Sequence, residues 1–316
     1  MNSNEIINGP VLVLVGPTAI GKTDLSLSLA EHFRCEIISV DSMQVYSFMD
    51  VGTAKATKKE RQRVQHHLID IVNPDENYDA ARFVEDARAA IIDIHNRGKI
   101  PLLTGGTGLY LKVLFEGIFS GVDADPQIRR ILEERLLTEG PDVLHQELCA
   151  CDHISAKRIH INDKHRLLRA LEVFLSTGKP WSEHLREHKA QNEGVRFPKA
   201  LLLGLTCERS ELYDRINTRC KEMLQSGLEE EVRSLLQQGY SRKLKAFRSI
   251  GYKHMIQYID GESDQNEMLT LLSRDTRRYA KRQYTWFSRI EKIQWLDVAQ
   301  KQEIFQKVDK WKKETL

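Results

Sequence analysis

Residues 11–23 constrain the fold of this chain more than any other stretch. Val11–Val15 is an unbroken run of valine and leucine, which is typical of a buried strand. Gly16–Thr23 follows it with the pattern G-x-x-x-x-G-K-T, and Asp24–Phe33 has the spacing of a helix. A strand, a glycine loop and a helix in this order form the setting in which backbone N–H groups and a helix N-terminus bind phosphate. The stretch therefore predicts a polyphosphate site.

Four residues of this loop have separate tasks in phosphate binding. Gly16 and Gly21 let the backbone turn tightly around an anion because they carry no Cβ. Lys22 brings a positive charge to the phosphates, and the Thr23 hydroxyl can ligate Mg²⁺. The alternative is a simple glycine turn with a chance Gly-Lys-Thr sequence. The motif indicates that a polyphosphate binds, and it leaves the reaction open.

Apolar strands and helical patterns alternate along the chain, which favours an α/β fold whose parallel sheet is flanked by helices, as in P-loop NTPases. Further strands are expected at Glu36–Val40, Lys99–Thr104 and Ala200–Thr206, and Ile293–Val298 is expected to be a closing edge strand. Another short strand is expected after His66-His67, ending at Val72. Helical structure is expected from Arg209 to about Gln237. It also dominates from about residue 121 to 188. We therefore expect a P-loop core at 9–120 and 199–316 and an inserted all-helical domain at 121–198.

Composition excludes several functional classes. A chain of 316 residues with a net charge of +2 gives no overall sign of nucleic-acid binding, so that evidence has to come from local clusters. No apolar run approaches the roughly 18 residues of a membrane span, and the first residues lack the pattern of a signal peptide. The five cysteines are an odd number without a C-x-x-C pair, which argues against disulfides and zinc. We expect a cytoplasmic protein without a membrane partner.

Polar residues follow the second strand at the sheet edge that carries the glycine loop. Residues just past the carboxyl ends of parallel strands line the ligand crevice, so Asp41 and Ser42 are expected near Lys22. A turn or a helix N-cap is the alternative role for Asp41. Gly105–Tyr110 places a second glycine loop at the same edge, where the backbone could approach a ligand closely.

Two other signals bear on metal and nucleotide chemistry. The pair His66-His67 invites a metal site, but adjacent strand residues face opposite sides, so structural hydrogen bonds are the preferred explanation. The strand Lys99–Thr104 lacks the terminal Asp with which an ATP hydrolase holds Mg²⁺, although Asp41 or Asp70 could serve. This absence weakens an ordinary ATPase or motor.

Basic residues gather in two helical segments. Arg215 and Arg219 lie four residues apart and share a helix face. A late helix at about Glu267–Phe287 carries two cationic rows, one of Arg274, Arg278 and Arg282 and the other of Arg277 and Lys281. Such rows fit nucleic-acid or phosphate binding as well as a solvated face. The residues alone leave open a small-molecule or nucleoside kinase, a group transferase with another diphosphate donor and, less well, a nucleic-acid-stimulated ATPase.

The motifs taken together resemble those of one family, the tRNA dimethylallyltransferases, also called tRNA isopentenyltransferases. They occur in family order over about Val11 to Phe287. The matching segments are Gly16–Thr23, Asp41–Tyr46, Gly52–Lys55, His66–Asp70, Gly105–Tyr110, Arg169–Val173, Ser249–Tyr252 and Thr276–Phe287. Any one of these segments is a weak signal, whereas the ordered set is specific.

The resemblance implies a prenyl transfer with Mg²⁺ as cofactor. Dimethylallyl diphosphate would bind the glycine loop, and its five-carbon group would move to the exocyclic amine of the adenine 3′-adjacent to the anticodon. Asp41 is then expected to accept the proton of that amine, with Thr18 and Arg215 as further catalytic residues. The diphosphate would be held by Gly16, Pro17, Thr18, Ala19, Ile20, Gly21, Lys22, Thr23 and Arg219, with the metal at Thr23.

The resemblance also implies contacts with the tRNA anticodon stem-loop. Those expected from the family are Asp41, Ser42, Met43, Gln44, Thr107, Arg129, His165, Arg166 and Arg169, and the late helix adds Arg278 and Arg282. The family usually has Gln at the position of His165 and Pro at that of Ala56. The zinc finger of some eukaryotic members has no counterpart after Cys220, which favours a bacterial-type enzyme.

Other functions share some of these features. A related prenyltransferase acts on free adenine nucleotides, but the helical insertion and the basic rows favour a large RNA substrate. A P-loop kinase or NTPase would also use the glycine loop. A non-enzymatic RNA-binding protein is disfavoured, because polar residues converge on that loop. We expect a monomer that needs no obligate protein partner.

Overall fold

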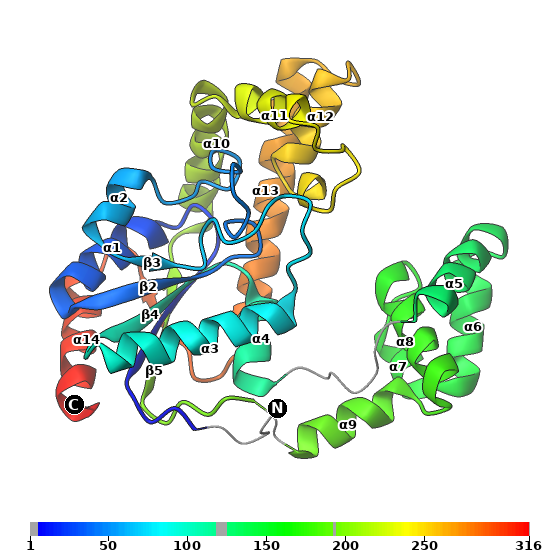
Figure 1. The fold of residues 1–316 in the computed structure, drawn as a ribbon, viewed down its shortest axis with the longest axis horizontal. Coiled ribbons are helices and arrows are strands. Elements are labelled where there is room, and N and C mark those ends of the chain that lie inside the picture. Colours follow the sequence, from blue (N-terminus) through cyan, green and yellow to red (C-terminus); the bar gives the residue numbers. More distant parts are fainter. Residues whose placement is uncertain (1–5, 118–124, 192–193, 316) are drawn as a thin grey trace. The chain divides into compact units, whose positions relative to one another are not determined.

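The computed structural model describes residues 6–117, 125–191 and 194–315 (Figure 1). The chain divides into two compact units, Leu114–Arg196 and the larger unit of Ile6–Val113 with Phe197–Leu316. The boundary expected between residues 120 and 121 falls outside the described residues.

A six-stranded parallel sheet forms the centre of the larger unit, in the order β3-β2-β4-β1-β5-β6. The strands are β1 (Val11–Val15), β2 (Cys35–Val40), β3 (His66–His67), β4 (Ile100–Gly105), β5 (Ala200–Thr206) and β6 (Gln294–Asp297). Every residue of β1 and β2 is buried, as expected for strands covered on both faces. The α/β fold predicted from the sequence is confirmed, with β6 as the edge strand.

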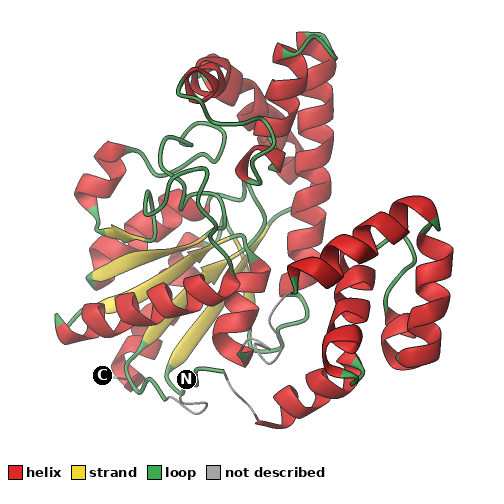
Figure 2. Cartoon of the chain, turned by 45° about the vertical axis from the view of Figure 1, so that its right-hand side comes forward, coloured by secondary structure: helices red, strands yellow, loops and turns green. Residues whose placement is uncertain are grey.

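Helices cover both faces of this sheet (Figures 1 and 2). The crossover through α1 (Lys22–Phe33) runs from β1 to β2, and the one through α3 (Ala80–Asn96) returns from β3 to β4. Because both connections are right-handed and run in opposite directions, the two helices lie on opposite faces. The other helices of this unit are α2 (Lys58–Arg63), α10 (Arg209–Gln225), α11 (Leu228–Gln237), α12 (Tyr252–Ile259), α13 (Gln265–Phe287) and α14 (Lys301–Thr315), with a 3-10 turn at Ala246–Arg248. Helix α4 (Gly108–Glu116) begins in this unit and continues past Val113 into the smaller one.

Two sequence predictions in this unit are wrong in detail. The strand expected to run on to Val72 stops at His67, because Leu68 and Asp70 adopt left-handed backbone angles of 60° and 56°. The helical stretch expected from Arg209 to Gln237 is two helices, since Gly227 has a φ of 93° and ends the first. After the break at Gly227, α11 reaches the loop that follows β2, where Glu231 contacts the backbone of residues 50–52.

The smaller unit is helical. Its helices are α5 (Pro126–Thr138), α6 (Pro141–Cys151), α7 (His153–Arg158), α8 (Lys164–Thr177) and α9 (Trp181–Gln191). Leu132, Leu144, Leu148, Leu167 and Leu171 form its core and are fully buried. The helical insertion predicted from the sequence therefore has a hydrophobic core of its own. No helix in the described ranges is both long and apolar enough to span a membrane.

Candidate active site

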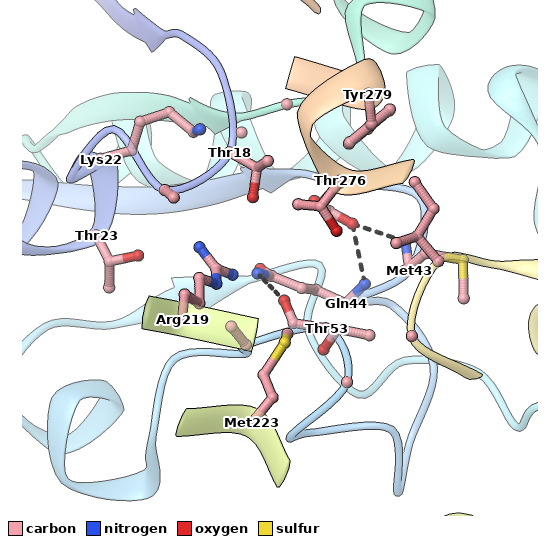
Figure 3. A pocket seen from close by; sticks show the side chains of 18 of the residues that line it. Thr18, Lys22, Thr23, Met43, Gln44, Thr53, Arg219, Met223, Thr276 and Tyr279 are labelled. Atoms are coloured by element: carbon pink, nitrogen blue, oxygen red, sulfur yellow. Dashed lines mark hydrogen bonds between the residues drawn. The ribbon is translucent and has the colours of Figure 1, made fainter. Parts of the chain in front are cut away.

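A cavity of about 1020 Å³ opens at the carboxyl edge of the sheet in the larger unit. Its walls come from the P-loop, from the loop after β2, from the end of β4 and from α10, α12 and α13 (Figure 3). The residues that line it include Thr18, Gly21, Lys22, Thr23, Asp41, Ser42, Met43, Gln44, Thr53, Gly106, Arg215, Arg219, Met223, Thr276, Tyr279, Arg282 and Gln283. The sequence prediction that Asp41 and Ser42 lie near the P-loop is confirmed by this shared cavity.

The P-loop folds around its own lysine. Lys22 Nζ donates to the carbonyl oxygens of Gly16 at 2.9 Å and of Pro17 at 2.8 Å. Gly21 is the N-cap of α1 with a φ of 100°, a conformation that a side chain would strain. Burial and, to a smaller extent, the charge of Arg219 lower the pKa of Lys22 to about 7, although the charge of Asp41 acts in the opposite direction. An anion in the cavity would favour the charged form of this lysine.

Asp41 lies at the start of the loop after β2. Its Oδ1 accepts from the backbone N–H groups of Met43 at 2.8 Å and Gln44 at 3.3 Å, so the turn considered as an alternative role is also present. Burial raises the pKa of Asp41, although these two N–H groups and the charges of Lys22 and Arg219 act in the opposite direction. A buried carboxylate with a raised pKa is a better proton acceptor than a solvated one.

The residues after Asp41 are held by contacts that fix their direction. Gln44 accepts from the Ser39 hydroxyl at 3.0 Å and donates to the Thr53 carbonyl at 3.5 Å. The Ser42 backbone N–H donates to Thr107 Oγ1 at 3.0 Å. Met43 and Gln44 therefore face the cavity from a braced turn (Figure 3).

Two arginines enter the cavity from α10. Arg215 Nη2 pairs with Glu211 at 2.6 Å, and its Nη1 donates to the carbonyl of Ile20 in the P-loop at 3.3 Å. Arg219 points from α10 into the space that Lys22 and Thr18 also face (Figure 3). Burial lowers the pKa of Arg219, and the charge of Asp41 opposes this shift. The cavity thus brings Lys22, Arg219 and the Asp41 carboxylate together at the P-loop.

The second glycine loop serves packing. A Cβ on Gly106 would lie 2.1 Å from Gln283 Nε2, and one on Gly108 would lie 2.1 Å from Trp286 Cδ1. A Cβ on Gly105 would meet the backbone oxygen of Val40 at 2.1 Å. Close backbone approach was predicted here for a ligand. In the structure, these positions need glycine because the side chains of α13 and the backbone at the end of β2 lie against them.

A further loop of the cavity is anchored by α11. Glu231 Oε2 accepts from the backbone N–H groups of Asp50 at 2.8 Å and Val51 at 2.7 Å, and Oε1 accepts from Gly52 at 3.1 Å. The same Oε1 accepts from the hydroxyl of the buried Tyr252 at 2.6 Å. The sequence reasoning did not single out Glu231, because an acidic residue in the first turn of a helix gives no sign of such a role.

The paired histidines make the structural hydrogen bonds expected of them. His66 Nδ1 lies 2.8 Å from the Val64 carbonyl, and His67 Nε2 lies 2.7 Å from Glu36 Oε2. The buried Glu36 also accepts from Arg97 and from Lys99. Burial raises the pKa of Glu36, but these three hydrogen bonds outweigh it and bring the value to about 2.

The two acidic candidates for metal binding, Asp41 and Asp70, lie in different surroundings. The Asp70 carboxylate pairs with Lys55 at 2.6 Å and Arg61 at 2.6 Å, whereas Asp41 lines the cavity. Within the described residues, no group of three or more His, Cys, Asp or Glu could hold a metal ion.

The basic residues predicted for RNA binding fall into two groups. On α13, Arg278 is exposed and lies 3.7 Å from Asp275, and Arg282 stacks over Tyr279 at the cavity. In the helical unit, Arg169 lies 3.1 Å and Arg129 3.7 Å from the buried Glu172. His165 and Arg166 are exposed at the start of α8, where Arg166 pairs with Asp163 at 2.9 Å.

Comparison with known proteins gives one consistent result. The profile of a family described as IPP transferase matches residues 44–290. A tRNA dimethylallyltransferase of Desulfotalea psychrophila is 55% identical over 99% of this chain and 98% of its own. The tRNA isopentenylpyrophosphate transferase of Bacillus halodurans matches in structure with a TM-score of 0.70 and 39% identity, covering 97% of both chains. A eukaryotic dimethylallyltransferase acting on tRNA gives a TM-score of 0.76 and 32% identity over 92% of this chain and 74% of that one.

Proposed function

The chain belongs to the IPP transferase family, and we propose from its cavity how it works as a tRNA dimethylallyltransferase. It moves the dimethylallyl group of dimethylallyl diphosphate to N6 of the adenine 3′-adjacent to the anticodon and releases diphosphate. One observation carries the mechanism: the Asp41 carboxylate shares a cavity with the P-loop lysine and with Arg219. A phosphate cradle that faces a base of raised pKa suits a transfer in which diphosphate leaves and a proton is removed.

The cations of the cavity stabilise the leaving group. The bond between the allylic carbon and the diphosphate oxygen breaks, and its electron pair leaves with the diphosphate. Lys22, Arg219 and the backbone N–H groups of the P-loop offset the negative charge that develops. Mg²⁺ fits this site in the manner of P-loop proteins, because the Thr23 hydroxyl lines the cavity and the remaining ligands would be diphosphate oxygens and water. The ion would supply further neutralisation of the diphosphate charge.

Asp41 removes the proton that the transfer leaves on the amine. The lone pair of N6 forms the new carbon–nitrogen bond, and one N6 proton passes to the Asp41 carboxylate. The hydrogen bonds from Met43 and Gln44 hold that carboxylate in one orientation. Its position at the cavity wall lets it face both the amine and the positive charge on the allylic carbon.

The acceptor base has to leave the stacked anticodon loop to reach this cavity. Gln44, braced by Ser39 and Thr53, presents an amide that can hydrogen-bond a base edge. Arg282 stacks on Tyr279 at the mouth, and the exposed Arg278 on the same helix is available to a phosphate. In the helical unit, Arg129, Arg169 and the exposed Arg166 supply further positive charge for the RNA.

The proposed function includes a cellular location and an oligomeric state. The five cysteines are free in the structure, which fits a reducing compartment. We propose that the enzyme acts in the cytoplasm and as a monomer.

Mass spectrometry of an adenine-containing anticodon stem-loop, incubated with Mg²⁺ and dimethylallyl diphosphate, tests the function. The expected result is the gain of one dimethylallyl group. Asp41→Asn should lower kcat by at least about a hundredfold, because a general base typically contributes that much, while donor binding survives. Near wild-type turnover of this variant would exclude Asp41 as the base. Turnover of AMP in preference to the stem-loop, or release of γ-phosphate from ATP without prenyl transfer, would contradict the proposed function.

A further inference from the structure

One buried side chain joins the two glycine loops. Gln283 on α13 is 5% exposed, and its Oε1 accepts from the backbone N–H of Thr18 in the P-loop at 2.8 Å. Its Nε2 donates to the carbonyl of Gly106 in the second glycine loop at 3.0 Å. The two partners lie 265 and 177 residues away in the sequence, so no local turn dictates this arrangement. A single amide thus bridges the loops that follow β1 and β4.

The second glycine loop is shaped to receive this side chain. A Cβ at Gly106 would overlap with the Gln283 amide, and one at Gly108 would overlap with the Trp286 ring. Tyr279, one turn before Gln283, lines the same cavity. The face of α13 formed by Tyr279, Gln283 and Trp286 therefore packs against the two loops, while Arg278 and Arg282 are exposed.

The hydrogen bond to Thr18 has a consequence for the P-loop. The loop binds an anion through backbone N–H groups that must point to one centre. The N–H of Thr18 is occupied by Gln283, which fixes the peptide plane at the start of the loop. The remaining N–H groups of the loop, up to those of Lys22 and Thr23, lie within five residues of this fixed plane.

We propose that Gln283 is a positioning residue that sets the diphosphate-binding conformation of the P-loop from α13. This inference rests on the proposed function, because it takes the P-loop to be the diphosphate site. The residue acts through Thr18 and does not itself touch the reacting atoms. Since the same helix carries the exposed Arg278 and Arg282, a displacement of α13 by RNA would be transmitted to the diphosphate site through this one amide.

Gln283→Met tests the proposal, because it keeps the length of the side chain and removes both hydrogen bonds. We expect the KM for dimethylallyl diphosphate to rise roughly tenfold to thirtyfold, as two buried hydrogen bonds are lost, while the KM for the stem-loop changes less than about twofold. Gln265→Glu, on the exposed first turn of α13, is the matched control and should change neither KM. Equal changes in both KM values, or a donor KM within twofold of wild type, would overturn the proposal.

Gln283→Glu gives a readout that a merely structural role would not move. When its carboxyl group is protonated it can accept from Thr18 and donate to Gly106, as the amide does; when it is ionised, it repels the carbonyl of Gly106. Burial raises the pKa of such a carboxyl group above its ordinary value. The ratio of the variant's donor KM to that of wild type should therefore fall as the pH falls from about 8 to about 6. A ratio that is independent of pH would contradict the role.

Taking the ratio of the two KM values cancels the effect of other titrating groups in the cavity, because both proteins contain them. These groups include Lys22, Asp41, His66, Arg219, Tyr279 and Arg282. Binding of inorganic diphosphate with Mg²⁺, measured by calorimetry, separates the two proposals. If wild type shows no prenyl transfer but Gln283→Met binds diphosphate at least tenfold more weakly, the proposed function fails and the role of Gln283 stands. If transfer occurs and diphosphate binding is unchanged in the variant, the role of Gln283 fails alone.

Discussion

Replacing Glu231 by alanine should destabilise the larger unit and disturb its cavity together. The carboxylate accepts four hydrogen bonds, from the backbone of Asp50, Val51 and Gly52 and from the hydroxyl of Tyr252. A hydrogen bond to a charged group contributes about 1.5–3 kcal/mol, but neighbouring bonds do not add fully, and Asp50 is exposed to water that can replace its partner. The buried Tyr252 hydroxyl has no such replacement. We expect the free energy of unfolding to fall by about 3–4 kcal/mol.

Activity should fall as well, because the anchored loop forms part of the cavity wall. Gly52 and Thr53 line the cavity, and the carbonyl of Thr53 accepts from Gln44. Once the loop is released, Gln44 loses one of the two contacts that orient its amide. We expect kcat/KM for the stem-loop to fall by about tenfold, the change that corresponds to one hydrogen bond.

Urea titrations followed by circular dichroism measure the loss of stability, with two controls. Glu230→Ala changes the neighbouring, exposed glutamate of α11 and should cost less than about 0.5 kcal/mol. Tyr252→Phe removes only one of the four hydrogen bonds and should cost about 1–2 kcal/mol. If the stability loss of Glu231→Ala lay within 1 kcal/mol of that of Glu230→Ala, the reasoning would be refuted. Water would then be accepting the hydrogen bonds of the loop N–H groups as well as the carboxylate does.

Two further predictions concern the sheet and its second glycine loop. The pKa of Glu36 is lowered from 4.5 to about 2. Its contribution to the free energy of unfolding is therefore fully present above pH 4.5 and is lost as the pH falls toward 2. That loss amounts to about 3 kcal/mol, and acid titrations of stability should show it in wild type but not in Glu36→Gln, which has no charge to lose. Gly105→Ala should impair folding, because its Cβ would meet a backbone oxygen, whereas Gly106→Ala should fold and raise the donor KM, because its Cβ displaces only the Gln283 amide. Thermal melts and donor kinetics of both variants distinguish these effects; equal thermal stability of the two would contradict this reasoning.

The elements that the sequence predicted well are those in which local pattern and tertiary packing agree. The strand Val11–Val15, the helix after it and the P-loop between them need no distant contact to be recognised. The strand expected beyond His67 failed because the left-handed backbone at Leu68 and Asp70 is set by contacts elsewhere: the Asp70 N–H donates to the Gln44 carbonyl at 3.2 Å, and the Asp70 carboxylate pairs with Lys55. Apolar pattern alone does not reveal such contacts.

For a similar reason, sequence pattern could not identify the residues that hold the cavity loops in place. Asp41 was found because its position after a strand predicts where it lies. Glu231 and Gln283 sit on helices far along the chain, and each acts on the backbone of a loop, so neither leaves a motif of side chains. Only the segment Thr276–Phe287, recognised as a whole, indicated that the late helix carries more than a row of charges.

The chemistry of this P-loop depends on what faces it. In a hydrolase the loop holds a phosphate that is attacked at phosphorus, which requires a positioned water molecule and a strand-end aspartate for Mg²⁺. Here β4 ends in Gly105, whose place against the Val40 backbone leaves no room for a side chain. The carboxylate at this edge is Asp41, at the end of β2, where two backbone N–H groups and burial hold it toward the cavity. We therefore propose that the carboxylate next to the loop accepts a proton from the incoming nucleophile, while attack falls on the carbon of the diphosphate ester.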